Sequence, residues 1–196
     1  MPLTRFFQPF VVGATSFGII ALGTYFAVGL DPAVLTSSES EEVREELRAF
    51  RMVPLDEFVA LNDGSPYRWV LGPGFAPPEA DGTWVRAQRA RIIFYLPENE
   101  SPGSINYLLE LSTSPLLADD QESRALTLRS RVDEVRMDLT PGGSRIFIEL
   151  DGAEEQVVEL ICDSLDVPPD DQGTSDIRRL CVKVYAMAVR PAEVSR

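Results

Sequence analysis

The chain contains no histidine and a single lysine, Lys183, among its 196 residues. Without histidine it lacks the most frequent general base and metal ligand of enzymes, and every catalytic triad that uses an imidazole. It also lacks the G-x-S-x-G turn of serine hydrolases, the P-loop and the glycine fingerprint of dinucleotide-binding folds. We therefore predict a protein that is not an enzyme, with no catalytic residue, no metal and no cofactor.

Positive charge is scarce, because 18 lysines and arginines stand against 31 aspartates and glutamates, for a net charge of −13. This imbalance repels nucleic acid and anionic lipid headgroups and argues against both as partners. Adjacent carboxylates occur in segments typical of turns, at Asp119-Asp120, Glu154-Glu155 and Asp170-Asp171. Calcium needs six to eight converging oxygens, and no calcium-loop spacing is present, so solvated turns are the favoured interpretation.

A long hydrophobic run occupies residues 6–30 and contains no charged side chain. As a helix it would be about 37 Å long, enough to cross a hydrocarbon core of roughly 30 Å. A cleaved signal peptide would have a shorter apolar stretch and a small-x-small site, so a retained transmembrane helix is favoured. Arg5 precedes the run and acidic residues follow it, which predicts a cytoplasmic N-terminus in a bacterial-type inner membrane and a periplasmic remainder.

Small residues recur along one side of this predicted span. Spacings of three and four residues would let a second helix approach closely, although small residues are also simply common in membrane helices. The candidate helix-packing interface consists of Ala14, Gly18, Ala21, Gly23, Tyr25 and Ala27.

Residues 31–50 predict a short connector and an amphipathic helix. Ser38 followed three residues later by Glu41 matches a capping box, and Val43, Leu47 and Phe50 form one apolar stripe. The expected organisation is thus a cytoplasmic tip and span (1–30), this connector and helix (31–50), and a periplasmic domain (51–196).

Period-two alternation of apolar and polar residues dominates the domain from Tyr67 onward, which is typical of half-buried strands. The residues expected to face a core include Ala90, Ile92, Phe94 and Leu96; Ile105, Tyr107, Leu109 and Leu111; Val135, Met137 and Leu139; Ile146, Ile148 and Leu150; and Leu180, Val182, Val184, Ala186 and Ala188.

About eight such strands separated by clusters of Pro, Gly, Asn and Asp predict an all-β, antiparallel sandwich. The absence of crossover helices between the strands argues against a doubly wound α/β fold. The strand order cannot be read from the alternation.

Cys162 and Cys181 are the two cysteines, and they lie on successive predicted strands. In an oxidising compartment they could form a disulfide that closes the intervening loop. Two separate buried thiols fit the same pattern. A disulfide requires Cα atoms within about 7 Å, and the sequence does not give this distance.

The segments YRWVLGPGFAPPEADGTWVRAQRARIIFYLP, LLELSTSPLL and DVPPDDQGTSDIRRLCVKVYAMAV resemble the jelly-roll-like β-sandwich domain of bacterial envelope proteins, which is often appended to membrane glycan or phosphoglycerol transferases. The resemblance covers about residues 67–190. Its E-x-x-G-x-W element corresponds to Glu79, Gly82 and Trp84, and its P-F-L element to residues 115–117. Its G-x-S-x-D-x-R-x-L-G element corresponds to Gly173, Ser175, Asp176, Arg178 and Leu180, with Cys181 where a glycine is expected.

The resemblance implies a jelly-roll-like sandwich in the envelope and a non-catalytic module that contacts glycans. Tryptophan side chains could stack on sugar rings, or could instead close the ends of the sandwich. Asp176 and Arg178 could form a local ion pair or bind a ligand. The candidate ligand-contacting residues are Trp69, Glu79, Trp84, Asp176 and Arg178.

Two hypotheses of function follow. In the first, the chain is a structural or accessory subunit of a larger respiratory, photosynthetic or transport complex, bound to other membrane subunits through its span and its sandwich. In the second, it is a glycan-binding module of envelope polysaccharide machinery. The small-residue face of the span and the lack of convergent polar motifs favour the first.

Overall fold

The computed structural model describes residues 37–97, 106–118, 121–168 and 178–192. Among them no helix is long and apolar enough to cross a membrane. The predicted transmembrane helix and its packing face of small residues lie outside the described residues and stay predictions.

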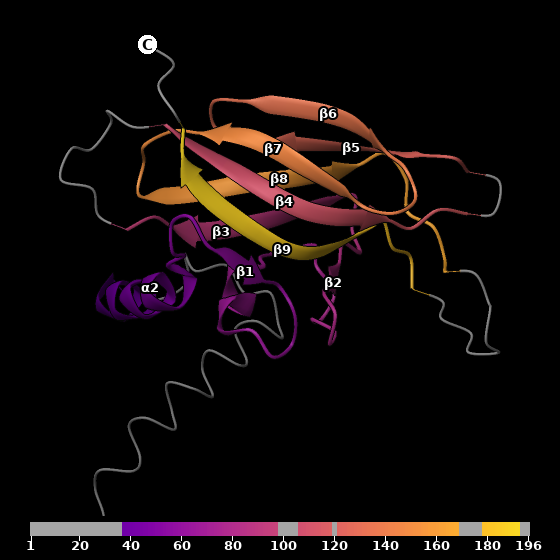
Figure 1. The fold of residues 1–196 in the computed structure, drawn as a ribbon. Helices are drawn as coiled ribbons and strands as arrows, with labels where there is room; N and C mark the ends of the chain where they lie inside the picture. Colours follow the sequence, from indigo (N-terminus) through magenta and orange to yellow (C-terminus); the bar gives the residue numbers. More distant parts are fainter. Residues whose placement is uncertain (1–36, 98–105, 119–120, 169–177, 193–196) are drawn as a thin grey trace, which may run out of the picture. The chain divides into compact units, whose positions relative to one another are not determined.

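The described part of the chain is one helix followed mainly by strands, all antiparallel within their sheets (Figure 1). The predicted amphipathic helix is present as α2 (Ser37–Arg51), and a short 3₁₀ helix, η2, spans Pro66–Val70. The strands are β1 (Phe58–Ala60), β2 (Thr83–Trp84), β3 (Arg89–Tyr95), β4 (Tyr107–Pro115), β5 (Arg124–Arg129), β6 (Glu134–Leu139), β7 (Ser144–Leu150), β8 (Glu155–Cys162) and β9 (Val182–Pro191).

Two sheets form a sandwich, as predicted. One has the order β1-β9-β4-β7 with β2 also paired to β9, and the other has the order β3-β8-β5-β6. The pairs β2·β9, β3·β8, β4·β7 and β5·β6 are nested, so the chain from β2 to β9 behaves like one long hairpin wrapped across both sheets. This nested order is that of a jelly roll, which agrees with the predicted class.

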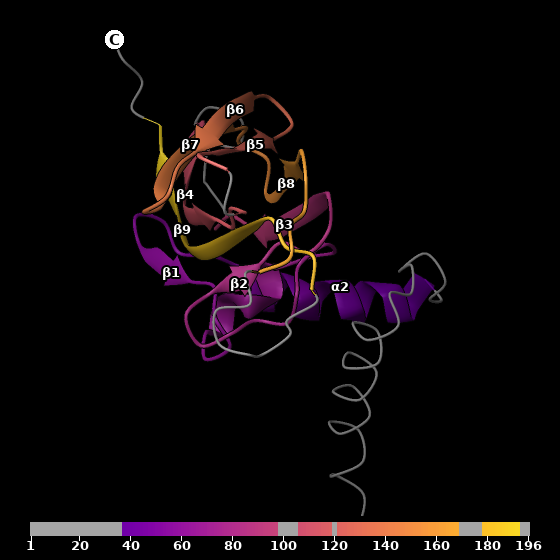
Figure 2. The same cartoon turned by 90° about the vertical axis from the view of Figure 1, so that its right-hand side faces the viewer.

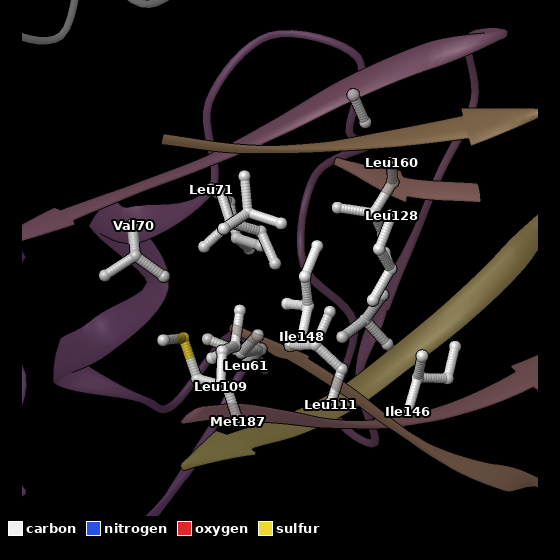
Figure 3. Close-up of a cluster of buried hydrophobic side chains, with 14 of the residues drawn as sticks. Leu61, Val70, Leu71, Leu109, Leu111, Leu128, Ile146, Ile148, Leu160 and Met187 are labelled. Carbon is white, nitrogen blue, oxygen red and sulfur yellow. The ribbon is translucent and has the colours of Figure 1, made fainter. Parts of the chain in front are cut away.

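The two sheets face each other (Figure 2), and the hydrophobic core lies between them (Figure 3). Strand β3 shows why the alternation predicted it, because Ala90, Ile92 and Phe94 are fully buried while Arg89 and Arg91 are exposed. Figure 3 shows Leu109 and Leu111 of β4 beside Ile146 and Ile148 of β7, and Leu128 and Leu160 of the other sheet, within the same cluster.

One part of the predicted inward face is wrong. Val182 and Val184 of β9 belong to the core cluster. Farther along the strand, Met187 and Val189 belong to it, whereas Ala186 and Ala188 do not. The cause is a break in register against β4, where Ser112 pairs with Ala186 and Thr113 pairs with Val184. Tyr185 is the extra residue on β9, and it forms a β-bulge that moves the following side chains to the opposite face.

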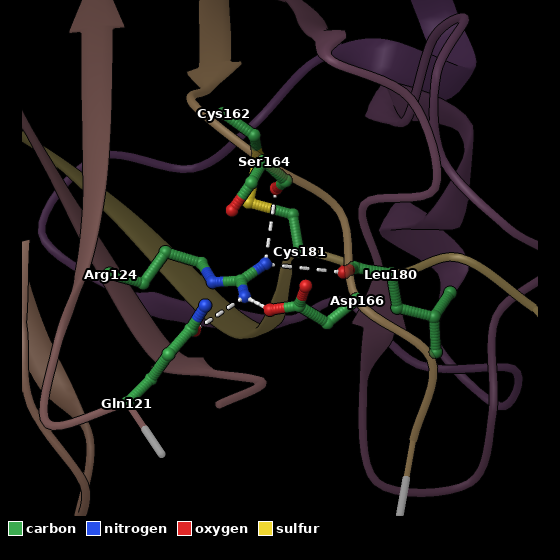
Figure 4. Close-up of a disulfide and its surroundings, with 7 residues drawn as sticks. All are labelled: Gln121, Arg124, Cys162, Ser164, Asp166, Leu180 and Cys181. Atoms are coloured by element: carbon green, nitrogen blue, oxygen red, sulfur yellow. Dashed lines mark hydrogen bonds and ion pairs between the residues drawn. A yellow bond between two sulfur atoms is a disulfide. The ribbon is translucent and has the colours of Figure 1, made fainter. Parts of the chain in front are cut away.

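Cys162 at the end of β8 and Cys181 next to β9 are joined by a disulfide, with Cα atoms 6.3 Å apart (Figure 4). Beside it lies the buried guanidinium of Arg124, which donates hydrogen bonds to the backbone oxygen of Ser164 at 3.1 Å and to Gln121, and forms an ion pair with Asp166. Burial lowers the pKa of Arg124. The disulfide and Arg124 together tie the residues just after β8 to those just before β9.

Candidate functional site beside Trp84

A tight turn places Trp84 on the edge of the first sheet. The backbone amide of Glu79 donates to the oxygen of Gly82 at 2.8 Å, and β2 then pairs with β9 so that Trp84 lies directly opposite Lys183. Gly82 has φ +154°, and a Cβ there would lie 2.8 Å from the backbone oxygen of Val184. Glycine is therefore required where β2 approaches β9.

The face that carries Trp84 points away from the core. Thr83 is fully buried, and its hydroxyl donates to the backbone oxygen of Leu61 at 2.6 Å. Val182 and Val184 face the core, so Lys183 between them projects outward with Trp84. Lys183 is nevertheless only 7% exposed, because neighbouring side chains cover it.

Lys183 forms a network with three other charged side chains. Its Nζ atom donates to Glu79 at 3.1 Å and to Asp81 at 2.5 Å. Arg178 donates to the other oxygen of Glu79 at 2.8 Å, across 99 residues of sequence. Two carboxylates and two cations of the described residues thus meet at one place.

Hydrogen bonds and charge attraction together outweigh burial in setting the protonation states of this network. Burial would raise the pKa of Glu79, but hydrogen bonds from Arg178 and Lys183 hold it below its usual value. Burial would likewise lower the pKa of Lys183, but its hydrogen bonds to Asp81 and Glu79 raise it. The hydrogen bond from Lys183 lowers the pKa of Asp81. All three groups are consequently charged at neutral pH.

Trp84 is partly exposed beside this network, and the Nζ atom of Lys183 lies 5.2 Å from the centre of its ring. The arrangement combines an apolar aromatic surface with several fixed donors and acceptors. A site of this kind can hold a polar ring by stacking and hydrogen bonds together.

The structure unites several residues that the sequence resemblance singled out. Glu79 from the first element contacts Arg178 from the third, Trp84 of the first element lies beside Lys183, which also contacts Glu79, and Pro115 of the second pairs with Val182 at the start of β9. Asp176 lies outside the described residues. The pairing of Arg178 with Glu79 is a long-range contact that local spacing could not predict.

Trp69 has a different environment. It lies on η2, where its ring centre is 5.9 Å from that of Phe50 and its backbone oxygen accepts a hydrogen bond from Arg51 at 2.8 Å. Arg68 lies over the same ring. Trp69 therefore helps to hold the end of α2 against the sandwich.

Sequence reasoning missed two members of the network, Lys183 and Asp81. Their signals were present, since Lys183 is the single lysine and Asp81 lies inside the E-x-x-G element. It also missed Glu110 on β4, a carboxylate that is only 2% exposed on the outer face of the same sheet and forms ion pairs with Arg145 and Arg190.

No group of three or more histidine, cysteine, aspartate or glutamate side chains that could hold a metal ion is found in the described ranges. Glu154, which belongs to the adjacent acidic pair Glu154-Glu155, forms an ion pair with Arg48 of α2.

No protein-family model matches the chain, and no curated protein matches it. Among solved structures it is similar to the carbohydrate-binding module CBM36 in complex with calcium and xylotriose, at 11% identity and a TM-score of 0.38, over 68% of this chain and 98% of that one. It is also similar to Xyl-CBM35 in complex with a glucuronic acid containing disaccharide, at 15% identity and a TM-score of 0.30, over 60% and 73%. A further similar chain is the Cry4Aa toxin of Bacillus thuringiensis, at 12% identity and a TM-score of 0.36, over 72% of this chain and 24% of the toxin chain. Similarity at this level assigns neither a family nor a function.

Proposed function

We propose that the β-sandwich is a non-catalytic glycan-binding module whose contact site is Trp84 with the charged network of Glu79, Asp81, Arg178 and Lys183. The observation that supports this function is the partly exposed Trp84 ring set beside four hydrogen-bonding side chains on the outer face of a sheet. The apolar face of a sugar ring can stack on an indole, while its hydroxyls can hydrogen-bond to carboxylates and cations.

The network favours a ligand whose groups both donate and accept hydrogen bonds. Glu79 and Asp81 are acceptors, and Arg178 and Lys183 are donors. Sugar hydroxyls, which both donate and accept, match a network that contains both kinds of group.

Glycan-array screening followed by fluorescence titration tests this proposal. The chain has two tryptophans, so a Trp69→Phe variant makes Trp84 the single indole reporter. We expect a neutral glycan from the array to change its emission, and Trp84→Ala to abolish binding when followed by calorimetry.

Trp69→Ala is the matched control, because it removes the same ring from a different element. It should retain binding once folding has been verified by circular dichroism. The proposal is wrong if no neutral glycan binds at millimolar concentration, or if both alanine variants weaken binding equally.

The periplasmic location remains a proposal, supported by the disulfide between Cys162 and Cys181, since disulfides persist in oxidising compartments. Fusion of a reporter that is active only in the periplasm to the C-terminus tests it, and an inactive, stably expressed fusion would contradict it.

The accessory-subunit hypothesis depends mainly on the helix predicted over residues 6–30 and stays a prediction. Purification in mild detergent with identification of co-purifying subunits tests it. Stoichiometric partners are expected, and a lone monomer would contradict it.

A further inference from the structure

A cavity of about 360 Å³ opens on the outer face of the second sheet, away from the Trp84 site. Three arginines line it, Arg91 on β3, Arg129 at the end of β5 and Arg131 in the turn that follows. Glu159, Val157 and Ser130 are among the other lining residues. Three guanidiniums at one cavity contrast with the net charge of −13 of the whole chain.

The strand register sets the positions of these side chains. Arg91 pairs with Glu159, Glu159 pairs with Arg129, and Arg129 pairs with Glu134, so a row of alternating charge crosses all four strands of the sheet. The neighbouring residues along β3 and β8, such as Ile92 and Val158, are fully buried. The row therefore projects outward, and the cavity lies over it.

Each arginine is held by one carboxylate. Arg91 Nη2 lies 2.9 Å from Glu159, Arg129 Nε lies 2.5 Å from Glu134, and Arg131 Nη1 lies 2.8 Å from Asp151. A guanidinium carries five N–H donors in a planar fork, so these contacts leave donors for a further acceptor. The ion pairs restrict the guanidiniums to one place before any ligand arrives.

Stability alone does not account for this row. The three arginine side chains are 54%, 45% and 60% exposed, and ion pairs between exposed groups contribute little to folding. Planar guanidiniums match carboxylate and phosphate oxygens bidentately. A volume of about 360 Å³ also lies within the range of small-molecule sites and exceeds that of a bare oxyanion.

We propose that this cavity binds the anionic group of a compact organic ligand through Arg91, Arg129 and Arg131, with Val157 as the apolar contact for its carbon skeleton. The ligand class is a small carboxylate or phosphate ester. This site lies on the other sheet from Trp84 and takes a different class of ligand, so either site can exist without the other.

Calorimetry with three probes tests the proposal: galacturonate, the neutral galactose of nearly the same shape, and inorganic phosphate. We expect galacturonate to bind with an affinity that falls as salt is added, and galactose not to bind at this site. Arg129→Gln and Arg131→Gln should each weaken galacturonate binding about tenfold. Binding of phosphate with the same dependence on the arginines would support a phosphate ester as the natural ligand.

Arg136→Gln is the matched control, because Arg136 is also an ion-paired arginine of this sheet, with Asp163 at 2.7 Å, but does not line the cavity. It should leave galacturonate binding unchanged. Arg129→Lys adds a variant that keeps the charge and loses the planar fork, and should bind more weakly than the wild type. The proposal is overturned if neither anion binds at millimolar concentration, if galactose binds as tightly as galacturonate to the Trp84→Ala variant, in which the proposed sugar site is removed, or if the cavity variants bind like Arg136→Gln.

Discussion

Lys183 and Trp84 face each other across neighbouring strands, with the Nζ atom of the lysine 5.2 Å from the centre of the indole ring. Lys183 is also the residue on which both Glu79 and Asp81 converge. Because it is the single lysine of the chain, its contribution can be measured without interference from any other lysine side chain.

The network should make stability depend on pH at both ends of the scale. The lowered pKa values of Glu79 and Asp81 stabilise the fold above their ordinary values of 4.5 and 3.8, and this contribution is lost as pH falls through the folded-state values. The raised pKa of Lys183 stabilises the fold at pH values below 10.5, the ordinary pKa of lysine. This contribution is lost as pH rises through the folded-state pKa.

Lys183→Met should therefore lower the free energy of unfolding by about 1 kcal/mol at neutral pH. The difference from the wild type should shrink in acid and again in strong alkali. Urea unfolding at a series of pH values measures it, and a difference that is constant across pH would contradict the network as its cause.

Much of the fold could be predicted from alternation, which is clear in strands such as β3, β7 and β8 that bury one face. The strands β1 and β2 could not, since three and two residues are too short for a periodic signal. The bulge in β9 was also invisible, because Ala186 and Ala188 are apolar enough to continue the pattern of Val182 and Val184.

The site was predictable only in part. Resemblance to a family pointed to Glu79, Trp84 and Arg178, and the structure brings Glu79 into contact with Arg178. Lys183 completes the network because β2 pairs with β9, about 100 residues away in the sequence. Such a long-range pairing cannot be predicted from local patterns in a single sequence. The arginine cavity depends on three strands in register and was missed for the same reason.

Gly82→Ala should disturb both stability and glycan binding. The new Cβ would meet the backbone oxygen of Val184 at 2.8 Å, so β2 must move away from β9 and carry Trp84 with it. We expect a loss of about 2 kcal/mol, measured by urea unfolding, and weaker binding at Trp84. Gly142→Ala is the control, because Gly142 also has a positive φ but open space around it. An equal loss in both variants would show that backbone conformation, not the close approach, is the cause.

Reduction of the Cys162–Cys181 disulfide should destabilise the domain. The cysteines are 19 residues apart, and closing a loop of this length stabilises a fold by about 3 kcal/mol in the chain-entropy model. Urea unfolding with and without dithiothreitol measures the difference. The double variant Cys162→Ala with Cys181→Ala should unfold like the reduced protein and be insensitive to dithiothreitol, and a reductant effect that persists in it would have another cause.

Arg124 should contribute separately from the disulfide that it adjoins (Figure 4). Its guanidinium is almost completely buried, and its removal leaves Asp166 and the backbone oxygen of Ser164 without their partner. We therefore expect Arg124→Met to lower the free energy of unfolding by about 3 kcal/mol, whereas Arg136→Met, which breaks an exposed ion pair with Asp163, should cost less than about 0.5 kcal/mol. Combining Arg124→Met with Asp166→Asn should recover part of the loss, because no unpaired charge then remains. If the double variant is no more stable than Arg124→Met alone, Arg124 stabilises the fold through its hydrogen bonds to backbone oxygens and not through the ion pair.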